Sequence, residues 1–321
     1  MKKEIKEKFK YLSNMVGNTP LVEICCEYKG KKRNIYAKLE WYNLTGSIKD
    51  RPALEILKSA YARGDLKRGQ TICETTSGNM GISISAIASF IGNPVVICMP
   101  RTMSRERQEM LKLFGAKLEL TEDFDEAFAR AEEYKSRGAY LPHQFENLDN
   151  EKAHYSSTAN EILEKLKNVD CFVSGVGTGG TLMGVGKHLK EQLGAKIIAI
   201  DPIEASLLKT GKPQGKHKIQ GLSDGRIPAL YTKDYVDEIL SINSDDAIAM
   251  AQKLCGELGL SVGISSGANF LGCLLSNKKT AVTVFADDNK KYLSTELTEP
   301  KSSKLVDEIK LISYKAVISK H

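Results

Sequence analysis

The side chain with the clearest chemical potential is Lys49, which ends a polar loop directly before a predicted helix. The loop reads Asn-Leu-Thr-Gly-Ser-Ile-Lys over residues 43–49. Pro52 suits the first helical turn, where the N–H that proline lacks needs no partner, and Gly64 marks the expected helix end. A lysine so placed can point into a cleft, and its amine forms Schiff bases with carbonyl compounds. Because a single lysine is more often a solvated surface residue, a chemical role for Lys49 depends on the remaining motifs of the sequence.

A glycine-rich segment is the second candidate, and it predicts a phosphate site. Residues 175–181 read Gly-Val-Gly-Thr-Gly-Gly-Thr between an apolar run and a helical pattern. Glycines let the backbone approach a phosphate, and the N–H groups at a helix start hold the anion. The spacing also matches G-x-G-x-x-G with Asp201 about twenty residues later, which is typical of nicotinamide dehydrogenases. Thr178 and Thr181 add hydroxyl donors and favour a single terminal phosphate.

Two further loops carry polar side chains at predicted helix starts. Residues 75–81 read Thr-Thr-Ser-Gly-Asn-Met-Gly and would form an anion site suited to an amino-acid carboxylate, or serve only as a helix cap. Residues 263–267 read Gly-Ile-Ser-Ser-Gly and predict a tight turn into a helix.

The elements that must position these loops alternate between short apolar runs and helical patterns, which indicates parallel βαβ units. The predicted strands are 34–39, 71–74, 94–98, 117–120, 171–176, 196–200 and 281–285. The predicted helices are 52–63, 82–90, 105–114, 124–137, 152–166, 183–193 and 244–258. After about Pro300 a helical pattern of Leu305, Ile309, Leu311 and Ile312 predicts a docking helix or a frayed end.

Length and composition narrow the class of protein. A chain of 321 residues favours two domains with a site between them. The net charge of +6 comes from dispersed lysines, so neither a nucleic-acid groove nor a membrane surface is predicted. The first residues lack the apolar core of a signal peptide, and seven cysteines without a C-x-x-C pair fit a reducing cytoplasm. Five dispersed histidines give no metal-ligand spacing, so no metal is expected.

Six segments in order resemble the cysteine synthase and cystathionine β-synthase family, pyridoxal-phosphate enzymes of the tryptophan synthase β fold. They are Gly-Asn-Thr-Pro-Leu at 17–21, Gly-Ser-Ile-Lys-Asp-Arg at 46–51, Thr-Ser-Gly-Asn-Met-Gly at 76–81, Gln-Phe-Glu-Asn at 144–147, Gly-Thr-Gly-Gly-Thr at 177–181 and Gly-Ile-Ser-Ser-Gly at 263–267. The resemblance covers roughly residues 12–297. It implies a two-domain α/β fold (fold type II) with twisted, mostly parallel sheets and the cofactor in the interdomain cleft.

This resemblance divides the chain and assigns roles. A smaller substrate-binding domain would span 45–150, a larger phosphate-binding domain 12–44 and 151–298, and a tail 299–321. Lys49 would carry pyridoxal 5'-phosphate as a Schiff base and shuttle protons, and Asn79 would contact the 3-hydroxyl group. Ser265, or less favourably Ser266, would face the pyridine nitrogen. The phosphate would lie on Gly177, Thr178, Gly179, Gly180 and Thr181. The substrate would lie on Thr76, Ser77, Gly78, Met80, Gln144 and Gly221.

The implied reaction is β-replacement through an aminoacrylate intermediate, by default O-acetylserine and sulfide giving cysteine and acetate. Two departures from the family stand out. Met80 replaces a usual threonine, and the loop 221–228 has Asp224 and Arg226 where the family has alanine and phenylalanine. Asp224 either pairs with Arg226 at the surface or acts as a general base for water or a thiol. The second option predicts a cysteine-consuming enzyme that releases hydrogen sulfide and forms serine or a thioether.

Three further expectations concern the oligomeric state and two alternative functions. Family members are commonly homodimers, so a homodimer is expected. A nicotinamide dehydrogenase is a remote alternative, because it leaves the motifs around Lys49 and Asn79 unexplained. A non-catalytic relative that binds a partner or senses metabolites is a third possibility, against which the intact Lys49 speaks.

Overall fold

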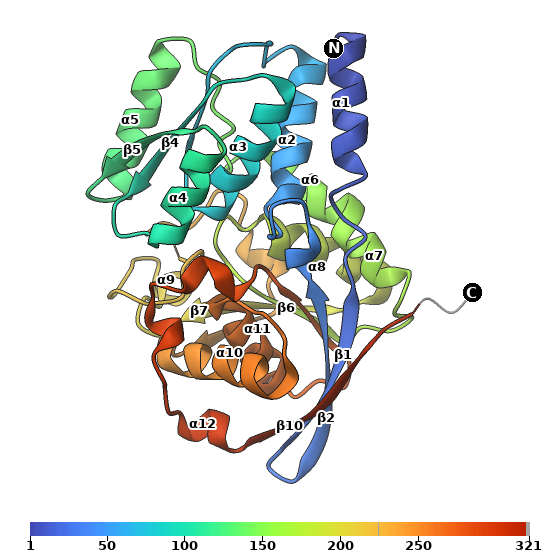
Figure 1. Cartoon of the computed structure of the whole chain (residues 1–321). Helices are drawn as coiled ribbons and strands as arrows, with labels where there is room; N and C mark the ends of the chain where they lie inside the picture. The colour runs from blue at the N-terminus through green and yellow to red at the C-terminus, as the bar shows by residue number, and fades with distance from the viewer. Residues whose placement is uncertain (224, 319–321) are drawn as a thin grey trace.

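Two sheets form the framework of the chain, whose computed structural model describes residues 1–223 and 225–318 (Figure 1). The larger sheet has seven strands in the order β10-β1-β2-β9-β6-β7-β8, and the smaller has three in the order β3-β4-β5. The strands are β1 Leu21–Tyr28, β2 Lys31–Leu39, β3 Ile72–Thr75, β4 Val95–Pro100, β5 Lys117–Thr121, β6 Cys171–Gly175, β7 Lys196–Pro202, β8 Glu238–Ile242, β9 Ala281–Phe285 and β10 Ile309–Ala316.

Most strand pairs are parallel, as the apolar runs predict. All residues of β4 and β9 are buried, which is expected for strands covered on both faces. The antiparallel pairs are β1 with β2 and β1 with β10, at one edge of the larger sheet. The parallel pairs place the carboxyl ends of β3, β6 and β9 beside the loops that the sequence singled out.

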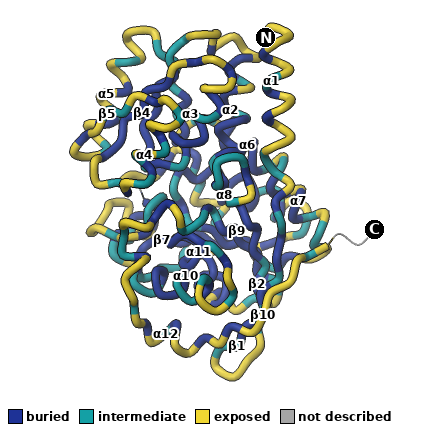
Figure 2. The backbone as a smooth tube through the Cα atoms, in the orientation of Figure 1, coloured by how far each residue is buried: buried dark blue, intermediate teal, exposed yellow. Residues whose placement is uncertain are grey.

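Helices cover both faces of each sheet. On the larger sheet α10 and α11 pack on one face and α8 on the other, so successive residues of β6 enter opposite cores, Cys171 and Val173 in one and Phe172 in the other. On the smaller sheet α1 to α4 cover one face and α5 the other. Figure 2 shows the buried segments in the interior of the molecule and the exposed ones around them. The main helices are α1 Lys3–Ser13, α2 Asp50–Arg63, α3 Asn79–Ile91, α4 Arg105–Leu113, α5 Phe124–Ser136, α6 Leu148–Ala153, α7 Ala159–Leu163, α8 Gly180–Leu193, α10 Ser244–Leu258 and α11 Ile264–Leu275.

The helical prediction for the C-terminal tail is wrong. A short helix α12, Lys304–Asp307, is followed by the strand β10, which pairs antiparallel with β1. Ile309 and Leu311 are buried at a spacing of two, whereas Ile312 is 44% exposed. Ile309 and Leu311 therefore follow the period of a strand, and pairing with β1 overrides the helical spacing of the four apolar residues.

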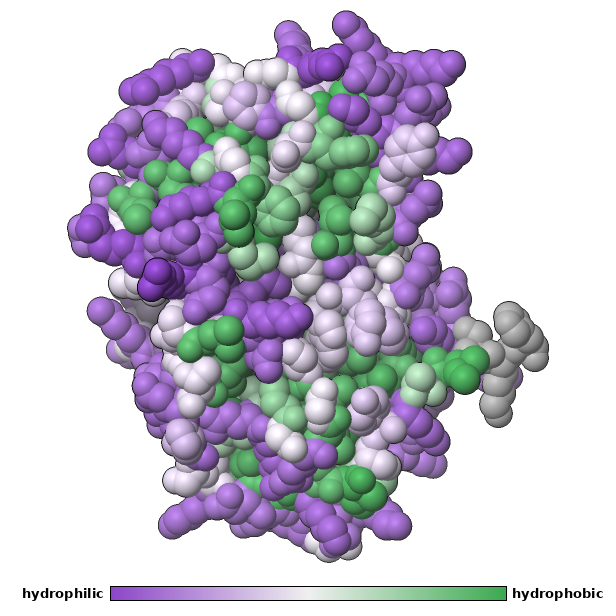
Figure 3. Space-filling model, viewed as in Figure 1, coloured by the Kyte–Doolittle hydropathy of each residue, from purple (hydrophilic) through white to green (hydrophobic). Residues whose placement is uncertain are grey.

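Other differences concern short or interrupted elements. The region predicted as one helix over 152–166 is divided by a π turn at His154–Thr158 into α6 and α7. The lysine-rich start of the chain forms α1, which buries Ile5, Phe9 and Leu12 and keeps its lysines outside. Figure 3 shows the resulting hydrophilic cover over the end of the molecule that holds α1 and α5. Within the described residues, no helix is long and apolar enough to span a membrane.

Candidate active site

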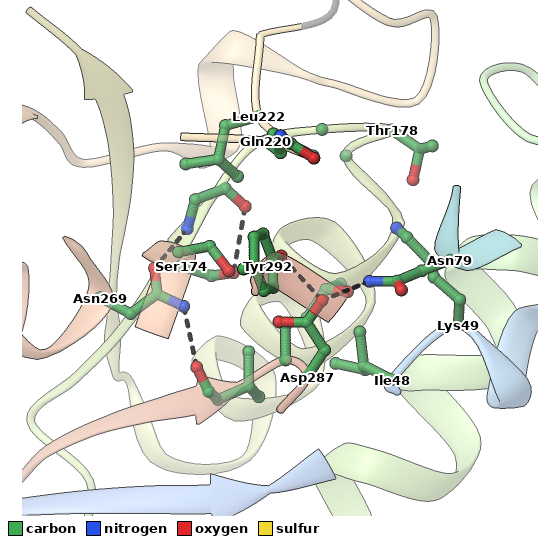
Figure 4. A pocket seen from close by; sticks show the side chains of 18 residues that line it. Ile48, Lys49, Asn79, Ser174, Thr178, Gln220, Leu222, Asn269, Asp287 and Tyr292 are labelled. Atoms are coloured by element: carbon green, nitrogen blue, oxygen red, sulfur yellow. Dashed lines mark hydrogen bonds between the residues drawn. The ribbon is translucent and has the colours of Figure 1, made fainter. Parts of the chain in front are cut away.

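The loops that follow β3, β6 and β9 meet around one cavity, hereafter the main cavity (Figure 4). Among the predicted site residues it is lined by Lys49, Asn79, Gly177, Thr178, Gly179, Thr181, Gly221 and Ser265. An adjoining side pocket shares four of these residues and adds Thr76, Ser77, Met80, Arg107 and Gln144. The structure therefore brings together segments that are more than two hundred residues apart in the sequence.

Lys49 borders both the main cavity and the side pocket, and its backbone is fixed by the start of α2. Its carbonyl oxygen accepts from the N–H of Ala53 at 3.0 Å. The next residue, Asp50, is buried and accepts from Thr45 through the backbone N–H at 2.7 Å and the hydroxyl at 2.6 Å. These bonds close the polar loop on itself and fix the backbone of Lys49 at the border of the main cavity.

A buried ion network lies beside Lys49. Arg51 donates through Nε to Glu40 at 2.7 Å and through Nη1 to Glu161 at 2.6 Å, and Lys38 lies 2.5 Å from Glu161. Although burial opposes ionisation, Arg51 and Lys38 hold the pKa of Glu40 at about 2. Because the four side chains come from β2, the segment after it, α2 and α7, the network ties the loop of Lys49 to the larger sheet.

The glycine-rich loop after β6 forms a cradle at the N-terminus of α8. A side chain at Gly177 would collide with the carbonyl oxygen of Gly221, and one at Gly180 with the amide of Asn150. Gly179 has φ +86°, a conformation that favours glycine. Asn150 donates to the hydroxyl of Thr178 at 3.0 Å, which orients that side chain. Backbone N–H groups and hydroxyls at the start of a 14-residue helix fit a phosphate group.

His154 is a site neighbour that the sequence did not indicate. It is fully buried, and burial, with a smaller contribution from Lys49, lowers the pKa of its imidazole to about 3. Its Nε2 lies 3.3 Å from the hydroxyl of Thr181, and its Nδ1 lies 3.0 Å from the hydroxyl of Thr158. A neutral imidazole here orients Thr181 without adding a positive charge.

Asn79 is held by a polar cluster that the sequence also missed. Its Nδ2 donates to Asp287 at 2.7 Å, and the hydroxyl of Tyr292 donates to the same oxygen at 2.8 Å (Figure 4). Arg107 donates to Tyr292 at 2.7 Å and also contacts Gln220. Within the described chain, Oδ1 of Asn79 is buried and has no hydrogen-bond partner. Such an orphaned acceptor beside Lys49 fits a polar ring substituent of a bound group.

The start of α11 supplies the opposite wall. Ser265 lines the main cavity, whereas Ser266 is fully buried and its hydroxyl has no partner within the described residues. Asn269, one turn later, donates to the carbonyl of Val284 at 2.8 Å and accepts from the N–H of Gly175 at 2.8 Å. These bonds fix α11 against β6 and β9, so that Ser265 faces the cavity.

The side pocket has the character of a carboxylate site with one apolar wall. Thr76 and Ser77 follow β3, and Gln144 is fixed by donating to the carbonyl of Thr75 at 2.8 Å. Met80 is buried in the wall, where a hydroxyl would otherwise add a donor. Gly78 is not among the lining residues, and the side chain of Arg107 packs directly against it.

Asp201, the residue on which the dehydrogenase alternative rests, makes its hydrogen bonds within the protein interior. It is buried and accepts from the N–H of Leu208 at 2.9 Å and from the hydroxyl of Ser223 at 3.2 Å. Asp224 lies outside the described residues. Arg226 forms an ion pair with Asp125 at 2.9 Å.

Comparisons with known proteins agree with this geometry. The model of the pyridoxal-phosphate dependent enzyme family matches residues 12–287. Cysteine synthase B of Campylobacter jejuni is 41% identical over 297 residues, 89% of this chain and 97% of that protein. A cysteine synthase structure from Entamoeba histolytica is 38% identical with a TM-score of 0.83, covering 92% of this chain and 93% of that one.

Another similar structure is a hydrogen sulfide-producing enzyme from Fusobacterium nucleatum. It is 46% identical with a TM-score of 0.91, covering 97% of this chain and all of that one. An aspartate-to-asparagine variant of this enzyme, complexed with an α-aminoacrylate intermediate, is also 46% identical and has a TM-score of 0.93, covering 95% of this chain and 97% of that one.

The fold and the cavity define a fold type II pyridoxal-phosphate enzyme with a two-domain, tryptophan synthase β-like architecture. The chain belongs to the pyridoxal-phosphate dependent enzyme family and to its cysteine synthase type. The nicotinamide dehydrogenase alternative is thereby wrong. When bound, the cofactor supplies an electron sink for carbanions next to a substrate amine. The cradle of Gly177 to Thr181, the orphaned oxygen of Asn79 and the hydroxyl of Ser265 fit its phosphate and ring.

Proposed function

We propose that the enzyme consumes L-cysteine by β-replacement and releases hydrogen sulfide. The carbon–sulfur bond of cysteine breaks, and water or a second thiol adds to the β-carbon, giving serine or a thioether. The observation that carries this proposal is the position of Asp224 in the chain. It directly follows Ser223 in the sequence. The two residues before Ser223, Gly221 and Leu222, line the main cavity.

The loop is fixed on both sides of Asp224. Before it, the N–H of Ser223 donates to the carbonyl of Val176 at 2.9 Å, beside the phosphate cradle. After it, the guanidinium of Arg226 lies 3.9 Å from the ring of Phe128. A carboxylate between such anchors suits a general base that accepts the proton of water or a thiol. The 46% identity with a hydrogen sulfide-producing enzyme supports the same direction of reaction.

The other roles follow from the cavity. Lys49 holds the cofactor and then removes and returns the proton of the substrate α-carbon, for which its place between both pockets is suitable. The substrate carboxylate lies on Thr76, Ser77 and Gln144, and Met80 forms an apolar wall of the same pocket. His154 holds Thr181 toward the phosphate as a neutral ring.

Cysteine formation from O-acetylserine and sulfide is the second candidate, supported by the 41% identity with a cysteine synthase B. Sulfide is already largely anionic near neutral pH, so this reaction needs no base at position 224. The two candidates share every step up to loss of the leaving group, and they differ in the leaving group and in the nucleophile.

Incubation with cysteine alone separates the two candidates. We expect sulfide in an amount equal to serine and thioether together, because cysteine is itself a thiol that can add to the β-carbon. In Asp224→Asn both should fall by about 10²-fold or more, while the protein keeps the yellow colour of its cofactor. Asp234→Asn, at an exposed position in the following segment, is the control and should change nothing. Slow cysteine turnover beside rapid use of O-acetylserine and sulfide would refute the first candidate.

Two organisational features belong to the proposal. The layer around the smaller sheet would be the substrate domain, residues 45–150, and the remainder of the core, residues 12–44 and 151–298, the phosphate domain. We also propose a homodimer, and light scattering on the eluting protein would detect a monomer if that is wrong.

A further inference from the structure

Arg107 is a buried cation that the proposed reaction does not use. It lies on α4, whose buried residues are Arg107 and Leu111, so the arginine occupies the helical face that normally carries apolar side chains. Its side chain is 2% exposed, and it lines the side pocket together with Lys49 and Asn79. A buried charge persists where it is paired, so the partners of the guanidinium indicate what it does.

One side of Arg107 contacts the loop 76–78, hereafter the substrate loop, which would receive the substrate carboxylate. The Arg107 side chain packs directly against Gly78, and its Nη1 lies 3.5 Å from the carbonyl oxygen of Ser77. Its Nε is buried and has no acceptor in the part of the chain that the structure describes. A donor left without a partner beside a pocket fits an anionic ligand that supplies the acceptor.

The other side of Arg107 is paired with Asp287, which follows β9. Nη2 donates to the hydroxyl of Tyr292 at 2.7 Å and lies 3.5 Å from Oδ2 of Asp287. The hydroxyl of Tyr292 donates to this same oxygen at 2.8 Å (Figure 4), and the Tyr292 ring lies 4.7 Å from the guanidinium. The guanidinium thus compensates the charge of Asp287 directly and through one hydroxyl group.

Asp287 and its neighbour Ala286 contact three segments that border the main cavity. Oδ2 of Asp287 accepts from Nδ2 of Asn79 at 2.7 Å, at the start of α3. The carbonyl oxygen of Asp287 accepts from the N–H of Gly263 at 3.0 Å, directly before α11. The carbonyl oxygen of Ala286 accepts from the N–H of Ile48 at 2.8 Å, in the polar loop. A shift of Asp287 would therefore disturb all three segments.

We propose that Arg107 is a positioning residue that couples binding of the substrate carboxylate to the residues that hold the cofactor. Its charge keeps Asp287 in the place where it holds Asn79. The same charge favours a carboxylate in the side pocket, since opposite charges attract strongly in a buried site. Substrate and Asp287 therefore share one guanidinium. The inference rests on the proposed place of the substrate carboxylate, and it does not depend on the leaving group or the nucleophile.

Binding of two non-reacting ligands to the holoenzyme tests the contribution of Arg107 to carboxylate binding. L-Alanine has no leaving group, and ethylamine is the same molecule without its carboxylate. Titrations followed by the visible spectrum give the dissociation constant of ethylamine divided by that of alanine. This ratio should fall about tenfold in Arg107→Met, the loss expected for one contact with a charged group. Arg107→Lys keeps the charge, so its ratio should stay within about threefold of wild type.

Titration of the apoprotein with pyridoxal 5'-phosphate tests the link to the cofactor. In Arg107→Met the dissociation constant of the cofactor should rise about tenfold, because Asp287 loses its compensating charge and holds Asn79 less firmly. Tyr292→Phe removes only the hydroxyl between Arg107 and Asp287. It should raise the cofactor constant about threefold and lower the ligand ratio by a similar factor, and it carries the test if Arg107→Met does not fold.

Ser104 provides the matched control, one turn before Arg107. It is also buried, and its hydroxyl donates to the carbonyl oxygen of Lys291 at 2.8 Å. Ser104 therefore joins α4 to the segment that carries Asp287 and Tyr292, but it lines neither the main cavity nor the side pocket. Ser104→Ala should leave the ligand ratio and the cofactor constant unchanged.

The proposal is overturned if Ser104→Ala changes both values as much as Arg107→Met, because fastening of α4 would then be sufficient. It is also overturned if Arg107→Met changes only one of the two values, since coupling requires both, or if Arg107→Met and Tyr292→Phe both keep the wild-type ratio. If the values change as expected but wild type releases no sulfide from cysteine, the role of Arg107 stands and the proposed cysteine consumption fails.

Discussion

Two charged regions of the molecule, hereafter the floor and the mouth, hold their charges in opposite ways. The floor is the network of Lys38, Glu40, Arg51 and Glu161. Within it, the side chains of Arg51 and Glu40 are at most 1% exposed. In the mouth, made of α5 and residues 225–229, the paired Arg226 and Asp125 side chains are 48% and 90% exposed. Buried charges tolerate no loss of a partner, whereas exposed pairs contribute little to stability. The floor therefore fixes the geometry around Lys49, and the ion pair of the mouth contributes little to stability.

The largest expected effect is at the residue that the floor positions. Lys49→Ala should lower turnover of any amino-acid substrate by about 10³-fold or more, because proton transfer and cofactor attachment are both lost. Thermal unfolding should change little, since the lysine borders cavities and not the core. Steady-state kinetics and the visible spectrum check this. Retained turnover would remove Lys49 from the mechanism.

Breaking the floor should unfold the protein more readily. Glu40→Gln leaves Arg51 and Lys38 with one carboxylate, and removal of one partner from a buried pair costs about 3–5 kcal/mol of unfolding free energy. Urea unfolding measures the change. A loss below about 1 kcal/mol, the value of an exposed pair, would erase the contrast between floor and mouth.

The same carboxylate predicts an acid dependence of stability. The folded-state pKa of Glu40 is about 2, below the ordinary value of 4.5, so its contribution is present above pH 4.5 and is lost as the pH falls toward 2. A shift of this size corresponds to about 3 kcal/mol. Unfolding midpoints measured across this range should fall more steeply in wild type than in Glu40→Gln. Parallel curves would contradict the assignment.

A smaller effect is expected at the phosphate cradle. Gly177→Ala adds a methyl group against the backbone carbonyl of Gly221, which cannot move aside, and such overpacking costs about 1–3 kcal/mol. We expect a correspondingly higher dissociation constant for the cofactor, measured by titration of the apoprotein. Gly256→Ala is the matched control, because its methyl group meets nothing within 4 Å and should stabilise α10 slightly.

The smallest effect is expected in the mouth. Asp125→Asn removes the exposed partner of Arg226 and should change the unfolding free energy by less than about 1 kcal/mol. Thermal unfolding compared with wild type gives the value. A loss as large as that of Glu40→Gln would show that the mouth is as rigidly built as the floor.

The sequence located elements best where the hydrophobic pattern is regular and uninterrupted. The predicted strand 281–285 and helix 244–258 match β9 and α10 to the residue, because a continuous apolar run and a regular helical face leave little choice of boundary. It failed at β10, whose pairing with β1 depends on residues almost three hundred positions away. Strand pairing of that kind is a tertiary effect that local periodicity does not contain.

The site shows the same division. Lys49, the glycine cradle and Ser265 lie in loops whose composition is unusual, and the structure gathers them around one cavity. Asp287 and Arg107 were missed, because their meeting with Asn79 exists only in the folded chain. A signal for Asp287 was available, since it follows the carboxyl end of the predicted strand 281–285, where sites of parallel sheets gather.

The strand β10 has a consequence for how the protein behaves in a concentrated solution. It covers the outer side of β1 along its length, with one irregularity in register at Cys25 and Cys26. Without this cover, β1 would offer unpaired backbone groups to any other extended chain. The last strand thus takes the edge position of the larger sheet itself, where its charged Lys310 and Lys315 oppose pairing with another extended chain.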